Sequence, residues 1–502
     1  MVSSSDLETT TSYGDSAASG GRWGAIRTVS LQLLTTVTTI VLARILVPAD
    51  FGAVAAALVI VGMFDLLTQA GIGTSLVRRD EVNTREASTI FWLACGVGIL
   101  AALLAAGFST PLAMLIGQPE AASLVGVLSW VIPLSLLRNV GRSLLQRLLR
   151  FRALALTEIT SLLTYGVIAI VLALWGWGPW AIVVGYLVRG GVGAVLNFVA
   201  ASWLPKLVFD RKFLRDELLF SSGVFGQQVM SYLSKNLDYW VVGAVLGATA
   251  LGAYYIAFVI PDLIRRRLST IAREVLYPIL ARIGVGNERA RLAYLRIVRL
   301  VAFVSVPAMI GLAVVSDLAV DLAFGSQWQA AAGPMAVLSL ASAVTSMSAP
   351  SIIVATAEGR PHIVLPAAGL GVAVLAIGLR ITSTTHDLTT MAWSVVAAAV
   401  VSSVGLLLVT GRLMGLKLTA FLFELLPMLV ATAIMAAGIG LIKAPVLSSL
   451  PTVGAAVTLV AVGVVIYFGV FGIFFRRALR EQLKALRTIL IPGRTRLANG
   501  PA

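Results

Sequence analysis

Charged residues are scarce in this chain of 502 residues: Asp, Glu, Lys and Arg make up 12% of it, and hydrophobic residues make up 58%. Soluble globular domains carry about 25% charged residues. Half that share leaves too little charge to cover a water-exposed surface, and the mean hydropathy of +0.95 agrees. The composition excludes a soluble enzyme, a disordered chain and a secreted disulfide scaffold, and it indicates an integral membrane protein.

Cysteine and histidine are almost absent. The single cysteine, Cys95, cannot form an internal disulfide, and the two histidines, His362 and His386, are far apart in the sequence. Zinc sites use clustered Cys and His ligands, so we expect no metal and no cofactor. The chain also lacks the Gly-x-x-x-x-Gly-Lys-Ser/Thr loop that binds ATP phosphates, which excludes an ATP-driven pump within this chain.

Long apolar stretches dominate the sequence instead. A helix that crosses a bilayer needs about 20 mostly apolar residues, and such runs without strong alternation predict helices rather than barrel strands. The expected fold class is therefore an all-α polytopic membrane protein of about fourteen helices. The predicted spans are 24–46, 51–77, 87–109, 122–146, 154–176, 178–200, 218–245, 250–275, 295–317, 331–356, 362–382, 388–411, 418–441 and 451–475.

Basic residues lie mainly on one side of these spans. If the N-terminus is cytoplasmic, the basic loops near 78–85, 147–152, 206–215, 282–299, 360 and 412–417 and the tail from 476 all face the cytoplasm. The opposite side has little beyond Arg44, Arg380 and Lys443. The positive-inside rule then places both termini in the cytoplasm and requires an even number of spans. It also accounts for most of the net charge of +15 without any nucleic acid.

Two short segments that lie 200 residues apart predict an internal repeat. Residues 45–52 read ILVPADFG and residues 245–252 read VLGATALG, and each is expected to form a short outer turn between two spans. Internal repeats are common in secondary transporters. The expected divisions are a disordered cytoplasmic tail (1–22), an N-terminal lobe (23–200), a cytoplasmic linker (201–217), a C-terminal lobe (218–411), two extra helices (412–475) and a basic tail (476–502).

The same segments carry a family resemblance. The span that ends LARILVPADFGAVAAA resembles the start of polysaccharide exporters of the Wzx or polysaccharide-transporter type, and VVGAVLGATALGAYYIAFVIPDLIRRRLSTIAREVLYPILARI is similar to a second-half segment of that family. The likeness extends over about 22–300 and points to the multidrug/oligosaccharidyl-lipid/polysaccharide exporter superfamily. It implies two six-helix lobes around a central cavity, often with two extra helices, and the flipping of lipid-linked saccharides from the cytoplasmic to the outer leaflet.

Charged residues within the spans predict a cationic cavity. An ionisable side chain in hydrocarbon costs about 2.5–3.5 kcal/mol on insertion scales, so such residues tend to face a cavity or a partner. Guanidinium groups bind phosphate oxygens bidentately, which suits a lipid pyrophosphate. The residues expected to bind this headgroup are Lys235, Arg265, Arg266, Arg267, Arg138, Arg142, Arg189 and Arg27.

Other interpretations of these cations remain open. Arg265–Arg267 can simply add to the positive-inside signal, and Arg138 and Arg142 can extend to the membrane interface.

Three acidic residues complete the expected site. Asp65 is either a proton or cation site or a counter-ion for Arg27. Asp238 shares a helix face with Lys235, and Asp262 is expected to pair with Arg266 while Arg265 points about 100° away.

We therefore predict an exporter rather than an enzyme. It would move an undecaprenyl-pyrophosphate-linked oligosaccharide from the inner to the outer leaflet of a bacterial cytoplasmic membrane by alternating access. Expected partners are the lipid-linked oligosaccharide, anionic lipids that hold the basic tail and polysaccharide synthesis enzymes.

Three alternatives stand beside the exporter. A cation-coupled multidrug exporter would need an acidic cavity, and a membrane enzyme of polysaccharide assembly would need an outer catalytic loop. For that loop the sequence offers only Asp317 and Asp321. An inactive scaffold in a synthesis complex is the third.

Overall fold

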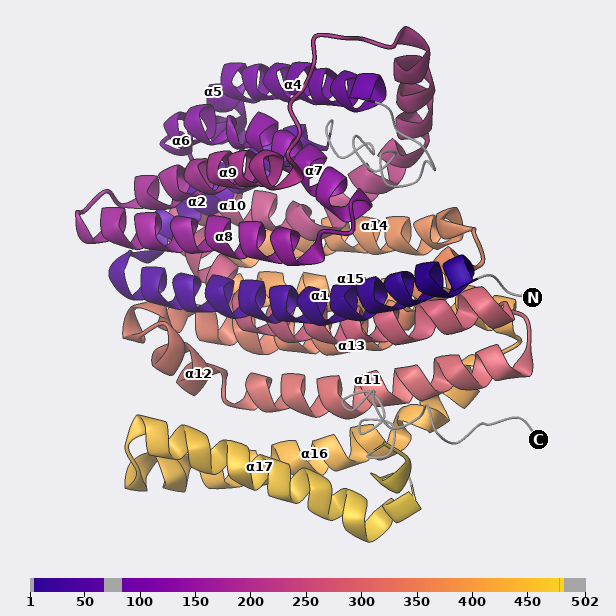
Figure 1. Cartoon of the computed structure of the whole chain (residues 1–502). Coiled ribbons are helices and arrows are strands. Elements are labelled where there is room, and N and C mark those ends of the chain that lie inside the picture. Colours follow the sequence, from indigo (N-terminus) through magenta and orange to yellow (C-terminus); the bar gives the residue numbers. More distant parts are fainter. Residues whose placement is uncertain (1–3, 67–83, 478, 483–502) are drawn as a thin grey trace. The chain divides into compact units, whose positions relative to one another are not determined.

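The computed structural model describes residues 4–66, 84–477 and 479–482, and this part of the chain contains helices and no strands. The all-α prediction is therefore confirmed for it. The α-helices (Figure 1) are α1 (Ser4–Ile45), α2 (Pro48–Asp65), α4 (Thr84–Gly107), α5 (Ser109–Leu115), α6 (Ala121–Leu128), α7 (Val131–Arg147), α8 (Phe151–Leu174), α9 (Pro179–Ala201), α10 (Arg211–Ile283), α11 (Glu288–Val314), α12 (Ser316–Ala323), α13 (Ala332–Ala357), α14 (Leu365–Thr382), α15 (Leu388–Met414), α16 (Leu418–Ser449) and α17 (Thr452–Phe474). Short 3-10 segments lie at Ser326–Ala331, Pro361–Val364 and Ser383–Thr385.

The number of membrane crossings depends on α10. Thirteen described segments are long and apolar enough to span a membrane, and one of them, Gln228–Ile283, has 56 residues. As a straight helix it would measure about 84 Å, almost three times the hydrocarbon thickness. However, Gly247 has a φ of +82°, which interrupts the helix.

Contacts on either side of Gly247 show that the chain reverses there. The Tyr254 hydroxyl donates to Asp238 Oδ2 over 2.9 Å, and the rings of Tyr239 and Tyr254 lie 5.4 Å apart. In one continuous helix residues 238 and 254 would be about 24 Å apart. The segment therefore forms a helical hairpin that can cross twice, and the thirteen segments give the predicted fourteen crossings.

The N-terminus differs from the prediction. The sequence predicted a disordered tail over 1–22, but α1 is helical from Ser4 onward. Extending a helix that already exists adds one hydrogen bond per residue and avoids the cost of nucleation, which is a physical reason for this continuation. Residues 67–77 of the second predicted span, together with Arg78 and Arg79, and residues 483–502 of the predicted basic tail lie outside the described residues.

The chain divides into two compact units, Met1–Tyr255 and Ile256–Ala502. The boundary thus differs from the predicted linker at 201–217. One reason is that the first part of α10 packs on α2: a Cβ atom on Gly52 would overlap the Ala248 carbonyl, and a Cβ on Gly252 would overlap the Pro48 carbonyl. A shift of 200 residues maps each of these contacts onto the other, in agreement with the predicted repeat.

The linker after α9 is also bound within the first unit. Trp92 Nε1 of α4 donates to the Lys206 carbonyl over 2.9 Å. The Lys206 and Asp210 amides donate to the Ser88 and Thr89 hydroxyls over 3.0 Å and 2.9 Å. These bonds fasten the segment before α10 to the start of α4.

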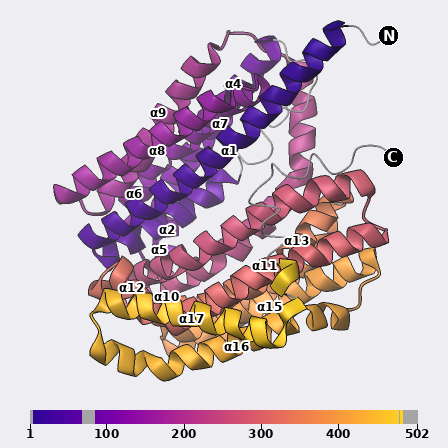
Figure 2. The ribbon, with the colours of Figure 1, turned by 60° about the horizontal axis from the view of Figure 1, so that its bottom comes forward.

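The helices that carry the predicted N-terminal charges lie side by side in the first unit. α8 packs against α1 and α9, and α7 packs against α9 and α4 (Figure 2). Glycines allow a close approach at these contacts, since Gly166 faces Thr38 and Gly190 faces Leu134. Close packing at small residues is typical of membrane helices, and here it brings side chains of α1, α7, α8 and α9 into contact range.

In the second unit, α16 and α17 pack on α11 through one apolar core that includes Phe303 and Phe471. The Tyr467 hydroxyl donates to the Phe303 carbonyl over 3.0 Å. At one end Lys443 pairs with Asp317 at 2.7 Å. The sequence placed Lys443 and Asp317 on the same side of the membrane, and their contact agrees with that placement.

Ion pairs also hold the other end of α16. Arg299 of α11 lies 3.4 Å from Glu424 and 3.7 Å from Glu481. Ion pairs thus hold α16 at both ends, to Arg299 of α11 and to Asp317 of α12, and apolar contacts attach α16 and α17 to α11.

Candidate functional site

Four of the predicted cationic residues lie near one another in the first unit, and two of them pair with one carboxylate. Glu158 of α8 lies with Oε2 3.5 Å from Arg27 Nη1 of α1 and with Oε1 3.4 Å from Arg142 Nε of α7. Arg138 interacts electrostatically with Arg142, Arg189 and Glu158. We call Arg27, Arg138, Arg142 and Arg189 the arginine cluster. Its four positive charges and the charge of Glu158 leave a net charge of three.

Helix geometry places these side chains. Arg138 and Arg142 are four residues apart and therefore share a face of α7. The Arg138 side chain lies over Gly193 of α9, where a Cβ atom would stand only 2.6 Å from Arg138 Cδ. Asn197 Nδ2 of α9 donates to the Arg138 carbonyl over 3.1 Å. The absence of a side chain at Gly193 thus makes room for one guanidinium arm of the cluster.

The arginine cluster has hydrogen-bond donors to spare. The Nε atoms of Arg27 and Arg189 are buried without a hydrogen-bond partner. The pairs with Glu158 are also loose, because charge-assisted hydrogen bonds measure about 2.7–2.9 Å. A buried donor without an acceptor is costly, so the arrangement is suited to an incoming group with several anionic oxygens.

A small cavity adjoins the cluster at Arg189. It has a volume of about 50 Å³. Its lining comes from α1, α2, α8, α9 and α10: Thr35, Thr39, Leu42, Phe51, Val54, Ala55, Leu58, Leu162, Tyr165, Ile182, Tyr186, Arg189 and Tyr255. A buried water needs about 10–15 Å³ of such volume, so the cavity has room for a few waters and none for a sugar ring.

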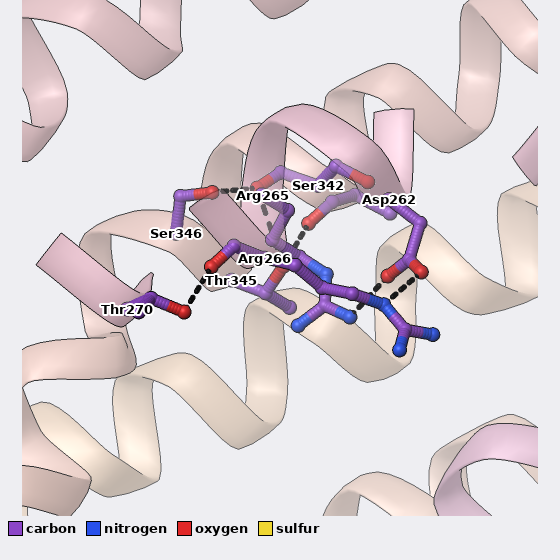
Figure 3. A network of polar contacts seen from close by, with 8 residues as sticks. Asp262, Arg265, Arg266, Thr270, Ser342, Thr345 and Ser346 are labelled. Carbon is purple, nitrogen blue, oxygen red and sulfur yellow. Dashed lines mark hydrogen bonds and ion pairs between the residues drawn. The ribbon is translucent and has the colours of Figure 1, made fainter. Parts of the chain in front are cut away.

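The second unit holds the predicted arginine run. Asp262 forms ion pairs with both Arg265 and Arg266 (Figure 3). The pair with Arg266 was predicted and is confirmed, whereas the expectation that Arg265 points away is wrong. Residues three and four positions along a helix both lie on the face of the first residue, so one carboxylate reaches both guanidinium groups. With Arg267, the run keeps a net charge of two.

The remaining predicted residues lie on α2 and α10. Asp238 is 3% exposed, and it accepts hydrogen bonds from the Tyr254 hydroxyl and the Tyr239 amide. Lys235 is exposed, so the two members of this predicted pair have different surroundings. Asp65 is the last residue of α2. Both interpretations of Asp65 stay predictions, and Arg27 also has Glu158 as a carboxylate partner.

Comparisons with known proteins identify the family. Residues 41–333 match the family model described as "Polysaccharide biosynthesis protein". The chain belongs to this family. The lipopolysaccharide biosynthesis protein WzxC of Escherichia coli K12 is 30% identical over 345 residues, which cover 68% of this chain and 70% of WzxC. The succinoglycan biosynthesis transport protein ExoT of Rhizobium meliloti is 30% identical over 322 residues, which cover 64% of this chain and 65% of ExoT.

The fold of this polysaccharide biosynthesis protein also has a solved counterpart. The structure described as lipid II flippase MurJ in an inward closed conformation aligns with a TM-score of 0.74, covering 91% of this chain and 99% of that one, at 14% identity. Such low identity establishes a shared fold only. The predicted assignment to the polysaccharide-transporter branch of the exporter superfamily is confirmed, and the chain is a multi-pass protein of the bacterial inner membrane.

Proposed function

We propose that this protein is a flippase that moves an undecaprenyl-pyrophosphate-linked oligosaccharide from the inner to the outer leaflet by alternating access. The observation that carries the proposal is the arginine cluster: four neighbouring guanidinium groups, two of which share one carboxylate, on helices that are apolar enough to span the membrane. The names of WzxC as a lipopolysaccharide biosynthesis protein and of ExoT as a succinoglycan transport protein support the same substrate class.

The chemistry of the cluster suits a pyrophosphate. Its oxygens are numerous and anionic, and each guanidinium offers five donors and stays charged. Two opposite charges at about 4 Å attract by about 4 kcal/mol at the effective dielectric constant of a partly exposed site. This attraction offsets the cost of holding several arginines at membrane depth. In this proposal Lys235 and Arg265–Arg267 are further contacts for the headgroup along its route.

Orientation and driving force follow from charge. We propose that both termini are cytoplasmic, as the basic loops favour. An outward movement of negative charge is then assisted by the membrane potential, by about 2.3 kcal/mol per charge per 100 mV. Asp65 is our candidate for a coupled cation or proton, and anionic lipids and synthesis enzymes are the proposed partners.

Two rival functions fit the charges less well. An exporter of organic cations needs carboxylates that face its substrate, whereas the arginine cluster has a net positive charge. A polysaccharide-assembly enzyme needs a positioned acid or base. The sequence candidates are Asp317 and Asp321, and Asp317 is paired with Lys443. We therefore propose a transporter without catalytic residues.

Flipping in proteoliposomes tests the proposal. The purified protein is reconstituted with a fluorescent pyrophosphate-linked oligosaccharide, a matched monophosphate-linked donor and a fluorescent organic cation, and exposure to a reagent that cannot cross the membrane is followed. We expect protein-dependent flipping of the pyrophosphate donor at a higher rate than the monophosphate donor. Export of the organic cation without flipping of either donor would contradict the proposal.

A further inference from the structure

Glu158 occupies the position that an anionic ligand of the arginine cluster would take. Its two carboxylate oxygens contact guanidinium groups on two other helices, Arg27 of α1 and Arg142 of α7, at 3.5 Å and 3.4 Å. Its side chain is 15% exposed, whereas that of Arg142 is 40% exposed. An anion that reaches Arg142 therefore meets the same donors that Glu158 uses.

We propose that Glu158 is a resident counter-ion that the substrate pyrophosphate displaces, and that it limits how tightly the cluster holds its anion. This inference rests on the proposed function and assigns a specificity role to a residue within the same site. Glu158 does not react with the substrate. It acts by competing for Arg27 and Arg142.

Geometry favours the exchange. Glu158 meets each arginine through one oxygen at a distance longer than that of a charge-assisted hydrogen bond. A pyrophosphate brings more charge and more oxygens, and the cluster has two donors without a partner, Arg27 Nε and Arg189 Nε. Planar guanidinium groups bind phosphate oxygens through two parallel bonds. Glu158 is therefore the weaker of the two anions at this site.

The displaced carboxylate also assists release. It remains on α8 beside the bound pyrophosphate, and like charges repel at that distance. Without it the cluster would bind the anion more tightly before transport and after it. Such uniform tightening lowers KM without raising turnover, and slow release then lowers kcat.

The variant Glu158→Gln tests the proposal, because it keeps the shape of the side chain and removes its charge. The full-length protein is titrated calorimetrically with farnesyl pyrophosphate, and flipping of the pyrophosphate donor is followed in parallel. We expect a Kd at least tenfold lower than that of the unsubstituted protein, together with a lower KM and a lower kcat. Glu288→Gln is the matched control, since Glu288 pairs with Arg291 at 3.6 Å on an exposed surface. It should leave Kd unchanged.

Several outcomes would overturn the proposal. An unchanged or raised Kd in a folded Glu158→Gln protein would do so, as would an equal effect in Glu288→Gln. If Glu158→Gln does not fold, Glu158→Asp withdraws the carboxylate by one methylene and should lower Kd by a smaller factor; no decrease there would equally refute the competition. If the unsubstituted protein flips the donor and Glu158→Gln binds farnesyl pyrophosphate with an unchanged Kd, only this inference fails. If the unsubstituted protein binds no pyrophosphate, the proposed function fails with it.

Discussion

At the residue scale, the position of one guanidinium depends on a missing side chain. Arg138 reaches the arginine cluster because Gly193 of α9 leaves space for its aliphatic arm. Gly193→Ala adds a methyl group 2.6 Å from Arg138 Cδ, which forces the arm to move. We expect the affinity for farnesyl pyrophosphate, measured by calorimetry, to fall several-fold.

Gly191 supplies the matched control for this change. It lies two residues earlier on α9, and a Cβ atom there meets nothing within 4 Å. Gly191→Ala should therefore leave the affinity unaltered. Equal losses in both variants would show that helix propensity, and not the place of Arg138, determines binding.

The sequence predicted the four arginines that the structure brings together, but not that Glu158 pairs with two of them. Arg138 and Arg142 share a helix face by their spacing, and Asp262 and Arg266 pair for the same reason. Glu158 and Arg27 belong to helices more than a hundred residues apart, so no local periodicity relates them. Their contact arises from the packing of α8 on α1, in which Gly166 lies against Thr38.

At the element scale, the two turns of the repeat hold α2 and α10 together. Gly52 lies against Ala248 and Gly252 lies against Pro48, so an added methyl group at either glycine meets a backbone carbonyl. Overpacking of a close contact costs about 1–3 kcal/mol. We expect Gly52→Ala and Gly252→Ala to lower the Tm of the solubilised protein by similar amounts, as equivalent contacts should.

The control for this pair is Gly126→Ala on α6, where a Cβ atom has open space. Its Tm should stay the same or rise slightly, because alanine favours helix. A loss in only one of the two repeat variants would contradict the reciprocal contact.

The C-terminal helices provide a second test at this scale. Lys443 of α16 pairs with Asp317 and also donates to the Val314 carbonyl over 2.8 Å. A double-mutant cycle with Lys443→Met and Asp317→Asn should give a coupling of about 0.5–1 kcal/mol in thermal unfolding. The exposed pair of Arg477 and Glu481 should give almost none, since Arg477 is 97% exposed. The same coupling in both cycles would refute an anchoring role for Lys443.

At the scale of the whole molecule, the alternation of sides along the chain is the property to test. In a Cys95→Ser background, Ser448→Cys places a thiol in the last turn of α16, and Gly286→Cys places one between α10 and α11; both positions are exposed. We expect a maleimide that cannot cross the membrane to label residue 448 in intact cells and residue 286 only after permeabilisation. The reverse pattern would invert the topology.

Hydropathy was sufficient to predict about fourteen membrane-spanning helices, because each span must be apolar over its length. It was not sufficient to predict the division at 255/256. That division reflects which helices pack together, and the contacts of Gly52 and Gly252 join residues about 200 positions apart. The short likeness between 45–52 and 245–252 marked both turns but gave no sign that they touch.

The central claim is that the arginine cluster binds the pyrophosphate during flipping. Its most direct test compares flipping rates in proteoliposomes for Arg142→Gln, Arg189→Gln and, as a control on the same helix as Arg142, Arg147→Gln. We predict that the first two substitutions each slow flipping of the pyrophosphate donor at least tenfold and that the control changes it less than twofold. Undiminished flipping in folded Arg142→Gln and Arg189→Gln proteins would contradict the claim.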